Sequence, residues 1–165
     1  MSKPSFLADD SGASAAEFAL VAPILFALLF GTIEVGGQGM VTSSLENAVG
    51  AASRTIRTGE SDGPTTASAF KNLICAGMVD SLTDCNARLS ISVKPFASFS
   101  SAGSAVTTTL DGTFNKGGAG DIILVQATYD WPAIAPTFDA HLNRIGPTKV
   151  LLSTQAVFKN EPYTS

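Results

Sequence analysis

Two cysteines, Cys75 and Cys85, are the residues whose type and spacing most readily suggest chemistry in this chain. They lie ten positions apart, without a CxxC pattern and without a neighbouring histidine. A metal site built on this pair alone is therefore not expected. The pair could be two buried thiols, or a disulfide that closes a small loop between two elements. If this part of the chain is exported, the disulfide is favoured, because thiols oxidise outside the cytosol.

The other polar residues suggest no catalytic site. The single histidine, His141, lies in a polar stretch and is expected on the surface, since no nucleophile motif accompanies it. The segment Lys116–Gly120 lacks both the sequence of a phosphate-binding loop and the spacing of a dinucleotide-binding turn. The sequence therefore predicts no enzyme, no cofactor and no metal. Four scattered carboxylates also form no recognisable calcium-binding loop: Asp80, Asp84, Asp111 and Asp130.

The composition narrows the class of protein further. Charged residues make up 15% of the 165 residues and hydrophobic residues 45%, which excludes an intrinsically disordered chain. The net charge of −4 argues against a nucleic-acid-binding protein, because such proteins carry a basic surface. The length suits one domain plus one special segment.

That special segment is the apolar run Ala13–Ile33, whose single charge is Glu17. With a rise of about 1.5 Å per residue, a helix over this run matches the roughly 30 Å hydrocarbon core of a membrane. The run is therefore interpreted as a transmembrane helix. The segment before it is poorly basic and no small-residue cleavage site follows Phe30, so a conventional removed signal peptide is not indicated. Lys3 lies before the run and no further basic residue follows until Arg54, which weakly favours a cytoplasmic N-terminus.

Glu17 is the unusual residue of the run. An ionisable group at membrane depth costs about 2.5–3.5 kcal/mol on insertion scales and is a functional candidate by default. The alternative is that Glu17, only one turn inside the run, extends its side chain to the lipid headgroups.

The residues around Glu17 carry a resemblance. Gly12 is followed by Ala-Ser-Ala-Ala-Glu-Phe and then by continuous apolar sequence, which resembles the class III signal of type IV pilins and pseudopilins. In that family a membrane aspartyl peptidase cuts after the glycine, so the resemblance implies processing between Gly12 and Ala13. The new amine of Ala13 would lie one helical turn from Glu17, on the same chain or on a neighbour, and a buried carboxylate matched with an ammonium is tolerated.

A narrower family is also indicated. The stretch GASAAEFALVAPILFALLFGTIEVGG, with Pro23 in the apolar run and Glu34 closing it, resembles the N-terminus of TadE-like pseudopilins. The segments Gly120–Pro132 and Ala156–Pro162 agree with this resemblance. These proteins belong to the tight-adherence (Flp-type, type IVc) pilus systems of bacteria. The resemblance implies a minor pseudopilin that takes part in pilus assembly in the bacterial inner membrane, with its N-terminus cytoplasmic and its C-terminal domain periplasmic.

The same resemblance implies a set of partners and leaves one alternative. The chain would cross the membrane once. Its protein partners would be a prepilin peptidase, other pilins and pseudopilins, and the inner-membrane platform of the pilus. No nucleic acid is expected. The alternative function is an uncleaved, single-pass, membrane-anchored periplasmic interaction module, and the mass of the chain in membranes distinguishes the two.

The expected organisation is a prepilin leader (1–12), a transmembrane helix (13–33), an amphipathic helix extension (34–58) and a periplasmic α+β domain (59–165). In the extension, apolar residues recur at helical spacing. Three glycines precede this stripe and could mark a flexible joint, a close helix contact or a break: Gly36, Gly37 and Gly39. The stripe itself comprises Val41, Leu45, Ala48, Val49, Ala52 and Ile56.

The domain is expected to contain a short helix and a small antiparallel sheet, giving a pilin-like α+β fold. The helix is predicted over Thr65–Val79, with Pro64 suited to its first turn. Its apolar face would be Phe70, Leu73, Ile74 and Met78. Alternation of Leu89, Ile91 and Val93 predicts one strand that stops at Pro95. A high content of β-branched and aromatic residues predicts two more strands, over Ile122–Trp131 and Val150–Phe158. The stretch Ala97–Gly120 reads as an exposed loop with a weak strand near Val106–Leu110.

Overall fold

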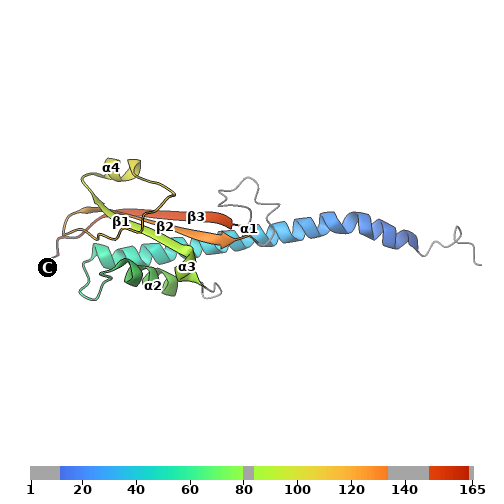
Figure 1. Ribbon diagram of the computed structural model, residues 1–165, viewed down its shortest axis with the longest axis horizontal. Coiled ribbons are helices and arrows are strands. Elements are labelled where there is room, and N and C mark those ends of the chain that lie inside the picture. Colours follow the sequence, from blue (N-terminus) through green and yellow to red (C-terminus); the bar gives the residue numbers. More distant parts are fainter. Residues whose placement is uncertain (1–11, 80–83, 134–148, 164–165) are drawn as a thin grey trace, which may run out of the picture.

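The computed structural model describes residues 12–79, 84–133 and 149–163 and has an α+β architecture (Figure 1). The expected fold class is confirmed: a long N-terminal apolar helix precedes short helices and a small antiparallel sheet. The elements are α1 (Ala13–Arg57), α2 (Ala67–Gly77), α3 (Cys85–Arg88), β1 (Leu89–Phe96), α4 (Phe99–Ser104), β2 (Ile122–Pro132) and β3 (Lys149–Lys159). Residues 1–11 of the expected leader, Asp80 and His141 lie outside the described residues.

Helix α1 is one uninterrupted helix of 45 residues, and its first half extends away from the sheet (Figure 1). The glycines at 36, 37 and 39 neither break it nor end it. Each glycine disfavours a helix by about 1 kcal/mol, but the helix is held by packing on the domain side of these glycines. At Gly37 the ring of Trp131 lies 3.4 Å from where a Cβ would stand, so this glycine marks a close contact.

The sheet contains three antiparallel strands in the order β1–β2–β3. Leu89 pairs with Tyr129 at one end of β1, and Lys149 pairs with Pro132 at the start of β3. The expectation that Pro95 stops the first strand is wrong, because β1 continues through Pro95 to Phe96. A proline is tolerated there because β1 is an edge strand and does not need every backbone N–H for pairing.

The main core lies between the sheet and the two helices α1 and α2. One face of β2 contributes alternate side chains to it, among them Val125 and Tyr129, which are fully buried. The stripe predicted on α1 is confirmed, since its six residues are all at most 5% exposed: Val41, Leu45, Ala48, Val49, Ala52 and Ile56. This buried stripe makes the second half of α1 part of the domain.

Helix α2 is shorter than predicted. Thr66 is its N-cap and accepts a hydrogen bond from Ala69 N, so Pro64 lies outside the helix and not in its first turn. Phe70 and Ile74 are buried as expected, but Leu73 is 40% exposed. The reason is geometric, since only a narrow side of this short helix faces α1 and the sheet.

The opposite face of the sheet is covered by α4 and the segment after it (Figure 1). The weak strand expected near Val106–Leu110 is absent from the described structure. A short helix forms upstream instead, because Ser98 and Ser101 cap its first turn reciprocally. Ala102 is fully buried against the sheet, and Gln126 Nε2 donates a 2.9 Å hydrogen bond to the carbonyl oxygen of Thr107.

A charged pair attaches the loop after α4 to β1. Lys94 Nζ lies 2.6 Å from Asp111 Oδ2, and Ser92 Oγ donates to Asp111 Oδ1 at 3.2 Å. The Lys94 ammonium is the main reason that the pKa of Asp111 lies well below its usual range, and hydrogen bonds from Thr113 lower it further. The loop is therefore fixed by polar contacts at the solvent-exposed edge of the sheet.

Candidate membrane and assembly segment

The first half of α1 presents large apolar side chains that no other described element covers. Only 11% of its most apolar 18-residue window is buried. A core helix of a soluble protein would bury most of this surface, so a bilayer is the environment that fits the segment. The exposed side chains, between 47% and 77% accessible, are Phe18, Leu20, Val21, Ile24, Leu25, Phe26, Leu28, Leu29, Phe30 and Ile33.

The three residues singled out from the sequence meet at the N-terminus of this helix. Gly12 is the residue just before α1, Ala13 is its first residue and Glu17 lies one turn further on; all three are exposed. The backbone of Gly12 has ordinary helical angles (φ −84°, ψ −15°), and a Cβ placed there would meet nothing within 4 Å. The fold itself therefore gives no steric or conformational reason for a glycine at position 12.

A second site lies at Glu34, where the apolar run ends, and the sequence alone indicates no function for this residue. The Glu34 carboxylate is only 1% exposed. Its Oε1 accepts hydrogen bonds from Trp131 Nε1 at 2.6 Å and from Gln38 Nε2 at 3.0 Å. Burial of a carboxylate is unfavourable unless donors compensate for the lost water. The contact therefore fixes the end of strand β2 to α1 at the point where the exposed apolar half of the helix ends.

The signal for this contact was weak in the sequence. An acid that closes an apolar run and a tryptophan at the end of a predicted strand were both visible, but they are 97 positions apart. Local periodicity does not link such distant residues. The contact has a structural role, because the indole of Trp131 and the amide of Gln38 are donors held on β2 and α1.

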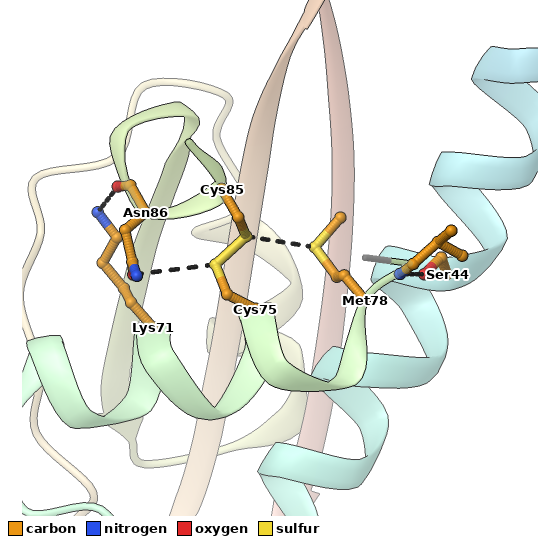
Figure 2. The surroundings of a disulfide bond; sticks show 7 residues. Ser44, Lys71, Cys75, Met78, Cys85 and Asn86 are labelled. Atoms are coloured by element: carbon orange, nitrogen blue, oxygen red, sulfur yellow. Dashed lines mark hydrogen bonds between the residues drawn. A yellow bond between two sulfur atoms is a disulfide. The ribbon is translucent and has the colours of Figure 1, made fainter. Parts of the chain in front are cut away.

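The two cysteines lie in α2 and at the start of α3 (Figure 2). They form a disulfide in the structure, which is the state expected if this part of the chain is exported. Their Cα atoms are 5.8 Å apart, and the bond joins α2 to α3. Figure 2 shows two further contacts around it. Lys71 Nζ donates to the carbonyl oxygen of Asn86 at 2.6 Å, and Val79 N donates to Ser44 Oγ of α1 at 2.9 Å. The disulfide thus reinforces a region that is also tied to α1.

The fold and the exposed helix define an α+β domain carried on a helix suited to membrane anchoring. Residues 12–54 match the model of a family described as TadE-like protein, so the resemblance noted from the sequence is confirmed over this range. The match starts at Gly12 and ends inside α1, before the domain's sheet. Neither the curated proteins nor the solved structures contain a match to the chain.

Proposed function

We propose that this chain is a minor pseudopilin that takes part in assembling a tight-adherence (Flp, type IVc) pilus. In this proposal prepilin peptidase cuts between Gly12 and Ala13, and the mature protein keeps its apolar helix. The observation that carries the proposal is the coincidence at the start of α1. The TadE-like match begins at Gly12, and the exposed apolar helix begins one residue later with Glu17 in its second turn.

The absence of a structural need for Gly12 supports the processing step. A glycine that the fold does not require is explained if a peptidase reads it, since a pocket that fits glycine leaves no room for a Cβ. The cut would leave a free amine on Ala13, at the end of a helix whose next turn carries Glu17. In the membrane that ammonium and the Glu17 carboxylate would pair, within one chain or between neighbours, and the pairing would set the axial offset of adjacent helices.

The proposed location follows from the division of α1. Residues 13–33 would cross the bacterial inner membrane once, with the N-terminus cytoplasmic, and residues 34–58 would continue into the periplasmic domain. The disulfide between Cys75 and Cys85 supports an oxidising location for that domain. The proposed partners are prepilin peptidase, other pilins and pseudopilins, and the inner-membrane platform of the pilus. The role is structural and needs no catalytic group.

The experiment that tests the proposal is the intact mass of the chain recovered from membranes. Processing predicts a mature protein that starts at Ala13, with residues 1–12 missing. The alternative, a permanently uncleaved membrane-anchored interaction module, predicts that these residues stay on the chain. The same measurement in cells without the prepilin peptidase is the control, because there the precursor should accumulate in the membrane.

A further inference from the structure

We propose that a groove between the last turns of α1 and the edge of β3 binds the acidic turn Gly59–Gly63 of a second copy of this chain. The inference rests on the membrane anchoring in the proposed function, because two copies anchored in one membrane from the same side present parallel helices. It does not require that the chain enters a pilus.

The groove has a volume of about 310 Å³. That is at the small end of the range of ligand pockets, which suits the side chains of a turn better than a cofactor. One wall belongs to α1 and the other to the end of β3. Its lining residues are Gly50, Ser53, Arg54, Arg57, Ala156, Val157 and Phe158.

Two groups in the groove have unused hydrogen-bonding capacity. Ser53 is only 4% exposed, and its Oγ has no hydrogen-bond partner among the described residues. Such buried polar groups normally have a partner. Arg54 is exposed, and within the described ranges its guanidinium forms no ion pair, whereas Arg57 lies 3.5 Å from Glu161. Arg54 therefore places in the groove a guanidinium that no described carboxylate neutralises.

The groove is also open to an approaching backbone. β3 pairs with β2 on one side, and no other described strand pairs with its outer edge. Gly50 is exposed, and a Cβ built on it would meet nothing within 4 Å. An incoming loop can therefore come close to α1 at this turn of the helix.

The chain itself carries an occupant of the required charge. The turn after α1 reads Gly-Glu-Ser-Asp-Gly, and both Glu60 and Asp62 are exposed. Arg54 lies in the last turn of α1, and Glu60 lies in the turn beyond its end, where the Glu60 N–H donates to the carbonyl oxygen of Thr55. The two positions are therefore offset along the helix axis by about one helical turn, roughly 5 Å. A parallel copy displaced along the membrane normal by about that distance brings its acidic turn level with Arg54. Opposite charges at matching heights then favour this stagger.

The alternative of direct pairing between two β3 edges is incompatible with a shared membrane. β3 runs in the same direction as α1, because Trp131, which pairs with Val150, contacts Glu34, and Arg57 contacts Glu161 at the other end. A two-fold axis that joined two β3 edges antiparallel would also reverse α1 in one copy. The proposed contact instead joins different surfaces of the two copies, the groove of one and the acidic turn of the other, and such a head-to-tail contact repeats from subunit to subunit.

Cysteine crosslinking of full-length copies tests the contact. One tagged copy carries Val157→Cys in the groove and a differently tagged copy carries Ser61→Cys in the acidic turn, so that the charged residues of the proposed contact stay in place while the native cysteines remain paired in their disulfide. We expect a mixed disulfide dimer in oxidised membranes, at a yield about fivefold above that of a control pair in which Glu46→Cys replaces Val157→Cys. Glu46 is exposed on α1 about two turns before Arg54. A yield no higher than the control overturns the inference.

Charge reversal gives a second, independent measurement. Arg54→Glu should lower the co-purification of the two tagged copies about fivefold, and Glu60→Arg with Asp62→Arg in the partner copy should restore it. Arg54→Gln, compared by thermal midpoint, shows whether a loss reflects folding. Failure of the restoration contradicts the pairing.

The outcomes distinguish this inference from the proposed function. If the chain is inserted and cleaved but does not crosslink, only this inference fails. If alkaline extraction removes the chain from membranes, the anchoring is wrong and both proposals fail.

Discussion

The indole Nε1 of Trp131 donates a 2.6 Å hydrogen bond to Oε1 of Glu34. One residue lies in the central strand and the other lies where the exposed half of α1 meets the domain. Both side chains are largely buried, at 7% and 1% exposure. The carboxylate is therefore held in place at the boundary between the proposed membrane segment and the folded domain.

Replacing Trp131 by Phe should destabilise the domain, because the Glu34 carboxylate would lose one of its donors while it stays buried. The expected loss is about 1–3 kcal/mol, the size of an unsatisfied buried polar group. The measurement is thermal unfolding of the detergent-solubilised full chain by circular dichroism. Glu34→Gln keeps an acceptor oxygen for the indole and should lower the thermal midpoint less than Trp131→Phe does. Equal midpoints for wild type and Trp131→Phe would contradict this role.

The parts of the fold that can be predicted from the sequence are those whose cause lies within one short segment of the chain. The buried stripe of α1 follows from helical periodicity, and the strands β2 and β3 follow from their content of β-branched and aromatic residues. A single segment contains each of these signals in full. The continuity of α1 through Gly37 does not, because it depends on the ring of Trp131 and the packing of the distant sheet. The exposure of Leu73 was missed for the same reason, since the helical spacing does not say how much of a helix is covered.

The same distinction holds for the candidate site. Gly12, Ala13 and Glu17 were found because their pattern is contiguous in the sequence. The Glu34–Trp131 contact was not found, because only folding brings the two residues together. The helix α4 was also missed, as its serine cap lies in a stretch whose composition is that of a loop.

Replacing Gly12 by Leu should abolish processing while it leaves insertion intact. The structure has open space at this position, so folding gives no reason for a defect. Intact mass and alkaline extraction of membranes should show only precursor in the membrane fraction. Gly12→Ala tests how strict the peptidase is. Mature-size protein from Gly12→Leu would rule out the pseudopilin assignment.

Replacing Glu17 by Gln should leave membrane levels and processing unchanged, because a lost charge makes the apolar run more easily inserted. It should prevent assembly, since an Ala13 ammonium inside the membrane would lose its partner at a cost of about 3–5 kcal/mol. Co-purification with other pilins and counts of surface pili measure the effect. Pili at the wild-type level would support the alternative in which Glu17 only reaches the headgroups.

Replacing both Cys75 and Cys85 by Ser should lower the stability of the domain by about 3 kcal/mol, the loop-closure value for a bridge of this short span. Insertion and processing should not change, because α1 is untouched. Thermal midpoints of the solubilised chain check the first expectation and intact mass checks the second. Two alkylatable thiols in wild-type material from the periplasmic side would show that the bridge does not form in cells.

The Lys94–Asp111 pair predicts a pH dependence. The pKa of Asp111 is lowered in the folded protein, so the stabilisation is present above the pKa of the unfolded carboxyl, about 4, and is lost as the pH falls below it. The difference in thermal midpoint between wild type and Asp111→Asn should therefore shrink below about pH 4. The effect should be small because both groups are exposed to solvent.

The continuity of α1 has a mechanical consequence. At about 1.5 Å per residue its 45 residues form a rod of roughly 68 Å. The domain contacts this helix at two positions along its axis, through the Trp131–Glu34 hydrogen bond and the Arg57–Glu161 ion pair. A push along the rod, or a twist about its axis, that is applied to the apolar half is therefore delivered to the whole domain without a joint to absorb it. An assembly complex that translates or rotates the membrane end of α1 therefore translates the domain by the same distance and rotates it by the same angle.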